Sequence, residues 1–561
     1  MFYPAQTSFI PVTVAIASFI ERHGFSGFYP FWYLGSTPVK YLTGPVVSSL
    51  LMALHRFLGG FSLFDLSLGL VVVAFLFSAL GWGILAWMLS GRRLYGYIVS
   101  LLVLLAPWHW ISGFALSEVS AQVTQALTPW VLWVFVRSLT ARGPVSSFPP
   151  ASARSRDNST LNLNSMGSLR AVGSPSRTAT PGGVYPERSR RVMFLRKFPS
   201  LPFVSNVNCQ LLVVSRLLPA AVLFALLLLT NTVASIPAII GLIIIGVVMD
   251  KRWEQGLKKA ALVIFLGWFL TLWWYPPHYW WTLFMAPSIG GRSAVGAMIS
   301  LVNLMRGFVP VILAIIVVAW GIRKKSLLDK FALSWFGVFG LLTLFRFFAD
   351  PKFWMDWTVW ISEVEVGVAL LIARNFQFSL LNFQSIFKFK FNNSIKISNF
   401  KFQISKLSIF YLPFTIYIVF GWFFAWQNRH FWLPRSDINQ SVEFKIAEVL
   451  NENVRSGELV FLSGSTAFWL NSFYDISQVR GGIDQVSQDP RWRQATWEIR
   501  EGATPEGTER VLAALRINYI VVHTQRSQEY YHDFRYPEKF GQITSLKKIY
   551  EQEGDVIYKV K

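Results

Sequence analysis

The 561-residue sequence contains very little cysteine and few charged residues. Cys209 is its one cysteine, so no intramolecular disulfide can form, and the lack of a CxxC or Cys/His cluster argues against structural zinc. Only 15% of the residues are charged, against about 25% in a typical soluble domain. Because 53% are hydrophobic and 16% aromatic, the composition indicates a membrane protein with a soluble part attached.

The formal net charge of +22 does not indicate a nucleic-acid-binding protein. The basic residues lie in alternate loops between apolar runs, at positions 92–93, 140–208, 250–259, 323–330 and 374–408. By the positive-inside rule these loops are cytoplasmic. Charge spread over such loops does not form a groove-binding face, so nucleic acid is not an expected partner.

Apolar runs near the ~20 residues needed to cross a bilayer recur along the chain. We expect about ten spans, at residues 66–90, 95–112, 121–139, 211–230, 233–249, 260–276, 298–320, 331–348, 359–373 and 409–427. The runs at 211–230 and 233–249 are separated only by Asn231-Thr232 and form either a tight hairpin or one long pass. The expected fold class is therefore a polytopic α-helical membrane protein.

The spans divide the chain into segments of different character. Residues 1–64 form an extracytoplasmic loop with interfacial helices, and spans fill 65–139, 209–373 and 409–427. Residues 140–208 form a disordered basic cytoplasmic insert, 374–408 a low-complexity basic insert, and 428–561 an extracytoplasmic domain. A regulatory tail or lipid-binding patch is the alternative interpretation of either insert.

Residues 8–20 are too short to span a membrane and are expected to form an interfacial helix. No upstream segment can export the N-terminus, and there is no signal peptide. We therefore expect a first transmembrane helix to be missing upstream of the sequence.

The C-terminal segment is expected to fold as a small α/β domain with a mainly parallel sheet. Residues 457–464 and 518–524 read as buried strands, Thr504-Pro505 starts a helix, and a hairpin turns at Gly554. Residues 464–485, rich in Gly, Asn, Gln and Trp, are either a carbohydrate-facing loop or a structural turn. No GxGxxG or P-loop supports a nucleotide site.

Acidic residues near the extracytoplasmic side of the membrane are few: Glu21, Asp65, Glu118, Asp350, Asp356, Glu363 and Glu365. An ionisable side chain at membrane depth is a functional candidate, and Glu118 lies in a short outward turn directly before a span. The alternative for each acid is an interfacial carboxylate that reaches water. Arg292, Arg346 and Lys352 are candidates for pairing with a lipid phosphate, or they anchor helix ends.

Aromatic side chains gather in two outward segments. "GFYPFWYLGSTPVKYLTGPVV", residues 27–47, includes Trp32 and Tyr33, and "WWYPPHYWW" contains His278. Such residues either anchor the protein in the interface or stack against a sugar or polyprenyl group. The seven histidines show no metal-binding spacing, and no nucleophile elbow is present.

Three stretches carry a family resemblance: "ERHGFSGFYPFWYLGSTPVKYLTGPVVSSLL", "GFALSEVSAQVTQALTPWVLWVFVRSL" and the tail that contains "INYIVVHTQRSQEYY". They resemble large prokaryotic membrane proteins of the family labelled "membrane protein, 6-pyruvoyl-tetrahydropterin synthase-related". The architecture of that family is similar to that of GT-C glycosyltransferases, which use polyprenyl-phosphate-linked sugars. Pterin chemistry is not implied, because the sequence lacks the metal-binding histidine cluster that this chemistry needs.

The resemblance implies sugar transfer from a polyprenyl-phosphate donor to a cell-envelope glycan, lipid or protein at the plasma membrane. Glu118 matches a Glu in the second outward loop of the related proteins and is the first catalytic candidate. The GT-C pattern places an Asp in the first outward loop, where this chain has Gln6-Thr7, so Glu21 is the second candidate.

Arg292, Lys352, Tyr33, Trp32 and His278 are the substrate-binding candidates. No metal ligands are assigned, although a divalent metal ion at the donor phosphate stays open. The expected partners are membrane lipids, the lipid-linked sugar and its acceptor. The alternative function is a non-catalytic protein that binds or exports an envelope polysaccharide or lipid.

Overall fold

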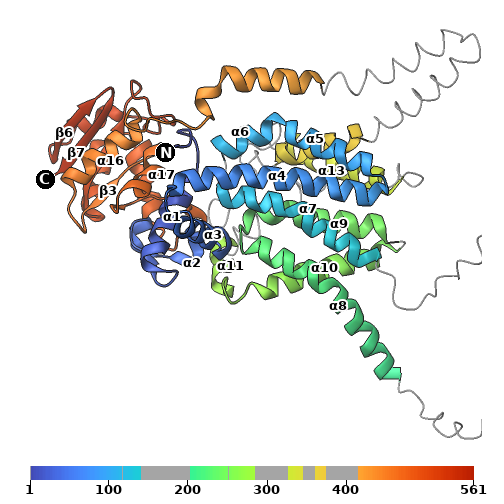
Figure 1. Cartoon of the computed structure of the whole chain (residues 1–561). Helices are drawn as coiled ribbons and strands as arrows, with labels where there is room; N and C mark the ends of the chain where they lie inside the picture. Colours follow the sequence, from blue (N-terminus) through green and yellow to red (C-terminus); the bar gives the residue numbers. More distant parts are fainter. Residues whose placement is uncertain are drawn as a thin grey trace, which may run out of the picture. The chain divides into compact units, whose positions relative to one another are not determined.

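The structure is a computed structural model that describes residues 2–116, 118–140, 202–250, 252–284, 326–344, 360–373 and 415–561. Contacts divide the chain into two units, Met1–Leu139 with Leu217–Lys561, and Thr140–Arg216. The first unit contains an N-terminal segment, a helical part and a C-terminal α/β domain (Figure 1). The predicted inserts 140–208 and 374–408 lie outside the described residues, except for Thr140 and residues 202–208, which are helical.

The helical part consists of apolar helices of very different lengths. They are α4 (Leu63–Ser90), α5 (Arg93–Leu105), α6 (Pro107–Ala115), α7 (Val119–Thr140), α8 (Pro202–Leu228), α9 (Ile236–Met249), α10 (Trp253–Leu270), α11 (Pro277–Phe284), α13 (Leu327–Leu344), residues 360–373 and Thr415–Gln427. Within the described residues, α4, α7 and α13 are each long and apolar enough to cross a membrane. A fourth span is obtained if α5 and α6 count as one, so the predicted total of about ten is not confirmed.

Three features shape this part. The predicted span at 95–112 is bent by 47° between α5 and α6, where Ala106 is extended and Pro107 occupies the first turn of α6. Helices α4 and α5 approach closely at Gly83 and Gly96, where an added Cβ would collide with the backbone of the opposite helix. Residues 229–232 separate α8 from the 3-10 turn η3 (Val233–Ser235) and α9, which excludes one long helix across this region.

The C-terminal domain is built from short elements in βαβ order. They are η6 (Arg429–Phe431), α16 (Val442–Asn453), β3 (Leu459–Phe461), α17 (Gly464–Phe473), β4 (Ser477–Gln478), η7 (Asp484–Val486), α18 (Arg491–Glu501), α19 (Pro505–Ala514), β5 (Ile517–His523), η8 (Pro537–Gln542), β6 (Leu546–Gln552) and β7 (Asp555–Val560). The strand order is β4-β3-β5-β7-β6. Strands β4, β3 and β5 pair in parallel, and β7 pairs antiparallel with both β5 and β6. The sheet is therefore mixed, whereas the sequence predicted a mainly parallel one.

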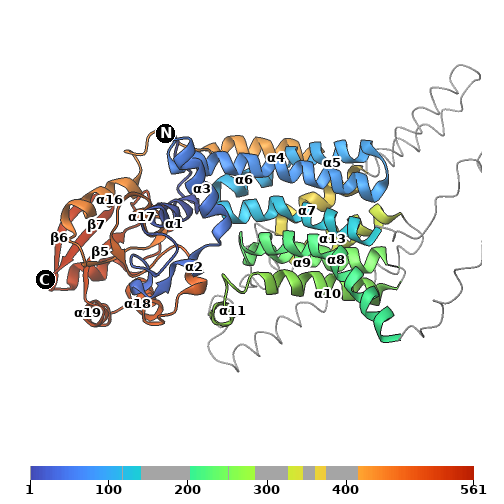
Figure 2. The same cartoon turned by 60° about the horizontal axis from the view of Figure 1, so that its bottom comes forward.

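Helices cover both faces of this sheet, and Figure 2 shows α16 and α19 on opposite sides of the strands. Alternate residues of β5 belong to different cores: Tyr519 and Val521 pack with α16, and Ile520 and Val522 pack with α18 and α19. This alternation follows from the two-residue period of a strand. Residues 464–473, predicted as loop or turn, form the buried helix α17 instead.

The N-terminal segment completes the second of these cores. It contains α1 (Ile10–His23), β1 (Phe28–Tyr29), η1 (Tyr33–Gly35), β2 (Thr37–Pro38), α2 (Val39–Leu42) and α3 (Pro45–Phe57). Ten of the 14 residues of α1 are buried, and α1 packs against α17, α4 and α3. The prediction of an interfacial helix at residues 8–20 is therefore wrong, because protein and not lipid covers this apolar helix.

Backbone and side-chain contacts join the segment to the C-terminal domain. Tyr3 and Arg435 exchange backbone hydrogen bonds of 2.8 and 2.7 Å, and the Phe31 carbonyl accepts from the Gln478 amide of edge strand β4 at 2.9 Å. Arg22 forms an ion pair with Asp475. The aromatic segment 27–47 is therefore part of a shared core and not a free loop.

Candidate functional site

Glu118 lies immediately before α7 and starts that helix. Its carbonyl oxygen accepts from the amides of Ala121 and Gln122, at 3.1 and 3.2 Å. Its carboxylate oxygen Oε2 accepts from the Ser120 hydroxyl at 3.1 Å, and the residue is half-buried. A negative charge is favourable at this end of a helix, so the local structure suits an ionised Glu118.

The first half of α7 carries polar side chains although the helix is long enough to span a membrane. Glu118, Gln122 and Gln125 follow one another at helical spacing and share a face, and Gln122 and Gln125 are 3% and 7% exposed. The Gln122 amide nitrogen is buried and has no hydrogen-bond partner among the described residues. Buried polar groups in a span are costly and mark functional regions, so we assign the candidate site to this end of α7.

A polar path leads from Glu118 to the turn between α8 and α9. Asn231 Nδ2 donates to Ser120 Oγ at 3.1 Å, which joins the turn to the start of α7. The next residue, Thr232, shares a 2.8 Å hydrogen bond with the hydroxyl of Tyr279 on α11. The α8–α9 turn therefore lies between Glu118 and the aromatic residues of α11.

His278 borders the same aromatic group. It is exposed on α11, its Nε2 lies 3.4 Å from the Gln488 side-chain amide, and its ring centroid is 6.4 Å from that of Tyr41. Tyr41 also packs edge-on against Tyr279, at 5.2 Å. The structure thus brings His278, but not the other predicted aromatic residues, to the region reached from Glu118.

Glu21, the second predicted acid, belongs to a different contact. Its carboxylate pairs with His55 Nδ1 at 2.9 Å and lies 3.7 Å from Arg56 Nε, both at the end of α3. Glu21 therefore joins α1 to α3, whereas Glu118 joins α7 to the α8–α9 turn. Arg292 and Lys352 lie outside the described residues.

Trp32 and Tyr33 face protein. Trp32 is 0% and Tyr33 1% exposed. The Trp32 indole nitrogen donates to Asn471 Oδ1 at 2.8 Å, and the Tyr33 ring packs on Trp492 at 4.8 Å. In this structure neither ring offers a face to a ligand, in contrast to the predicted stacking role.

Glu365, one of the acids noted in the sequence, is buried at the break between α5 and α6. Its carboxylate accepts from the amides of Trp108 and His109 at 3.1 and 3.2 Å, from His109 Nδ1 at 2.6 Å, and from the Tyr417 hydroxyl. These amides lie in the first turn of α6, where a helix supplies no carbonyl of its own to accept from them. Glu365 therefore satisfies the backbone groups that the bend exposes.

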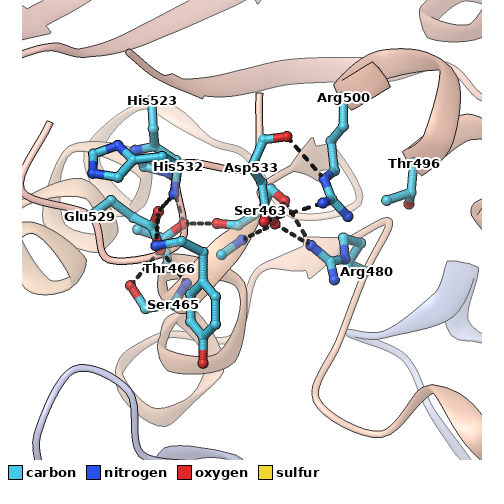
Figure 3. Close-up of polar contacts among 12 residues, drawn as sticks. Ser463, Ser465, Thr466, Arg480, Thr496, Arg500, His523, Glu529, His532 and Asp533 are labelled. Carbon is cyan, nitrogen blue, oxygen red and sulfur yellow. Dashed lines mark hydrogen bonds and ion pairs between the residues drawn. The ribbon is translucent and has the colours of Figure 1, made fainter. Parts of the chain in front are cut away.

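Sequence reasoning missed a polar cluster at the carboxyl ends of the parallel strands in the C-terminal domain (Figure 3). Asp533 accepts from the Ser463 hydroxyl and the Gly464 amide, and it pairs with Arg480 and Arg500 at 3.2 Å each. Burial alone would raise the pKa of Asp533, but the Ser463 hydrogen bond and the two arginines outweigh it and lower that pKa.

Two further carboxylates, Glu529 and Glu443, lie beside Asp533 and its arginines. Glu529 accepts from the amides of Ser465, Tyr531 and His532 at 2.6, 2.9 and 2.9 Å. The Ser465 hydroxyl lies 2.5 Å from Glu443 and 3.0 Å from Glu529, although it has one proton to donate. Burial, and to a smaller extent the charge of Glu529, raises the pKa of Glu443 above its ordinary value.

The cluster holds the loop after β5 against the start of α17 and satisfies its own polar groups. The strand–Gly–helix pattern at Ser463-Gly464-Ser465 was the sequence signal for it, since polar loops at the carboxyl ends of parallel strands meet at one edge. Within the described ranges, no group of three His, Cys, Asp or Glu side chains converges in a way that could hold a metal ion.

Comparisons with known proteins give a likeness in structure and not in sequence. No family model and no curated protein matches the chain. The archaeal oligosaccharyltransferase AglB from Archaeoglobus fulgidus, in complex with an inhibitory peptide and a dolichol-phosphate, aligns with a TM-score of 0.53 and 10% identity over 100% of this chain and 71% of that one. An Archaeoglobus fulgidus oligosaccharyltransferase in its apo form aligns with a TM-score of 0.53 and 10% identity over 99% of this chain and 71% of that one. The Archaeoglobus fulgidus oligosaccharyltransferase tethered with an acceptor peptide aligns with a TM-score of 0.52 and 10% identity over 100% and 70%.

At this identity the likeness concerns the fold. The expected relation to the 6-pyruvoyl-tetrahydropterin synthase-related family has no support in these comparisons. The chain has the GT-C-like architecture of these glycosyltransferase structures, over its helical part and its C-terminal domain alike.

Proposed function

We propose that the protein is a membrane glycosyltransferase that moves a sugar from a polyprenyl-phosphate donor to a cell-envelope glycan, lipid or protein. The observation that carries this proposal is the GT-C-like fold over the whole chain. The half-buried Glu118 at the start of a polar-faced membrane helix adds a site to that fold.

In the proposed reaction Glu118 is the general base. It takes the proton of an acceptor hydroxyl while the acceptor oxygen bonds to the anomeric carbon of the donor sugar. The bond from that carbon to the phosphate oxygen breaks, and the polyprenyl phosphate leaves with the electron pair. A carboxylate within hydrogen-bond reach of the acceptor can supply this step, and cations stabilise the phosphate that leaves.

Other residues receive proposed roles from their chemistry and position. Arg292 and Lys352 are proposed to bind the leaving phosphate, and the exposed His278 to contact a sugar ring. The basic loops suggest that the protein lies in the plasma membrane with residues 428–561 outside the cytoplasm. AglB has been captured with a dolichol-phosphate, which fits a lipid-linked donor here.

The test is incorporation of radiolabelled sugar from polyprenyl-phosphate donors into envelope fractions. Glu118→Gln should lower incorporation at least about a hundredfold, since a general base contributes 10²–10⁴. Glu254→Gln is the matched control, because Glu254 is an exposed glutamate in the first turn of α10. Unchanged incorporation in Glu118→Gln removes the assigned base, and no incorporation by the wild type favours a non-catalytic protein that binds or exports an envelope polymer.

A further inference from the structure

Asn231 lies in the turn between α8 and η3, and its side-chain amide has a defined orientation. Oδ1 accepts from the backbone amides of Val233 and Ala234, each at 3.0 Å. Because an amide nitrogen cannot accept these hydrogen bonds, the oxygen must face the backbone. The nitrogen Nδ2 therefore faces Ser120, 3.1 Å from its Oγ.

This orientation determines what the Ser120 hydroxyl does. Ser120 is 7% exposed, and its Oγ accepts the hydrogen bond from Asn231. A hydroxyl has one proton to donate, and the Glu118 Oε2 atom lies 3.1 Å away. The hydroxyl proton thus points to Glu118, and the three side chains form one directed chain of hydrogen bonds.

We propose that Asn231 is a positioning residue, which through Ser120 holds the Glu118 carboxylate in the orientation in which it removes the acceptor's proton. The hydrogen bond fixes one carboxylate oxygen and with it the plane of the group. This inference rests on the proposed function in so far as Glu118 is the base. It adds that the reaction depends on a turn 111 residues away in the sequence.

Asn231→Asp separates the two tasks of this side chain. The new carboxylate still accepts from the Val233 and Ala234 amides, because aspartate caps a helix start as well as asparagine. It cannot donate to Ser120, so the hydroxyl proton turns to it and leaves Glu118. We expect kcat to fall at least about tenfold, the equivalent of one lost hydrogen bond, with KM and the thermal midpoint unchanged.

The double variant distinguishes positioning from a merely structural role. Ser120→Ala should lower kcat by a similar factor, and adding Asn231→Asp to it should cause no further loss, since both act through one chain. Asn428→Asp is the matched control, because Asn428 also donates from its side-chain amide nitrogen, in this case to the Phe424 carbonyl at 2.9 Å and far from Glu118 in the sequence. Losses that multiply would overturn the proposal.

A measurement without turnover keeps this inference separate from the proposed function. A carbodiimide modifies protonated carboxyl groups, and mass spectrometry of the peptide with Glu118 measures its rate of labelling in purified protein. Asn231→Asp should speed labelling of Glu118 about tenfold at a fixed pH, because Glu118 loses a donor and gains a second carboxylate nearby.

Faster labelling with normal transfer in Glu118→Gln supports the hydrogen-bond chain and refutes the base. Loss of transfer in Glu118→Gln, with labelling and kcat both unchanged in Asn231→Asp, overturns the role of Asn231 and leaves the proposed function in place.

Discussion

Replacing Trp32 by alanine removes one of the largest fully buried side chains of the molecule, at the contact between the N-terminal segment and the C-terminal domain. The indole is 0% exposed and packs against Gly481. Truncation of a buried tryptophan costs about 3–5 kcal/mol, and loss of its hydrogen bond to Asn471 is part of that. Asn471 Oδ1 still accepts from Gln478 Nε2 at 2.7 Å, so no buried acceptor is left without a partner. We therefore expect about 4 kcal/mol.

Gly481 provides a second variant for a double-mutant cycle. An added Cβ at this position would fall inside van der Waals contact of the Trp32 ring, so Gly481→Ala alone should cost about 1–3 kcal/mol. Trp32→Ala removes the two ring atoms that the added Cβ would meet too closely, and only the Cβ of residue 32, at 2.7 Å, still has to shift. The double variant should therefore be at least about 1 kcal/mol more stable than the sum of the single changes predicts.

The free energy of unfolding is measured by pulse proteolysis in urea on detergent-solubilised protein, with cleavage followed in the C-terminal domain. Gly541→Ala is the matched control, since an added Cβ there meets no atom within 4 Å. Additive effects at Trp32 and Gly481, or a Trp32→Ala variant as stable as the wild type, would refute the proposed packing. At a temperature where Trp32→Ala is folded, an unchanged KM would separate this role from substrate binding.

Three further changes test the polar groups. Because burial raises the folded-state pKa of Glu443, its contribution falls as pH rises above the unfolded value, and Glu443→Gln should raise the urea midpoint at pH 8 more than at pH 5. The pKa of Asp533 is lowered, so its stabilisation is present above about pH 4 and is lost as pH falls through the folded-state pKa. Asp533→Asn, which breaks the pairs with Arg480 and Arg500, should cost about 2–3 kcal/mol at pH 7 and much less at pH 3, and an equal cost at both contradicts this. Gln122→Met removes a buried donor that has no partner within the described part of the chain, so the thermal midpoint should stay or rise, and a fall contradicts the assignment.

Local signals predicted local structure well. Thr504 caps α19, accepting from the Gly507 amide at 3.3 Å, and Pro505 is its first residue, as the sequence indicated. The β6–β7 hairpin turns at Gly554, whose φ of 90° suits glycine. In each case the determining contacts lie within a few residues, and a single sequence contains them.

Errors arose where the partner is distant in the sequence. Helix α1 is apolar, and the sequence of an apolar helix is the same whether lipid or protein surrounds it. Its packing partner α17 begins at Gly464, more than 400 residues later in the sequence. The same limit applies to the site. Glu118 was selected as an acid at membrane depth, but nothing near it in the sequence indicated Asn231. The segment with Trp32 was interpreted as a possible ligand surface because its buried partner, Asn471, is 439 residues away in the sequence.

The shared core of the N-terminal segment and the C-terminal domain has a consequence for biosynthesis. Trp32 and Asn471 are 439 residues apart, so at about 5–20 residues per second the ribosome makes the second roughly 20–90 s after the first. During that interval the helices between them enter the membrane, while Tyr29 and Trp32, both 0% exposed in the finished protein, have only each other and N-terminal neighbours such as Phe19 to pack against. A chain that stops before Asn471 therefore leaves these aromatic side chains accessible, which is the type of feature that chaperones and proteases recognise in unfinished proteins.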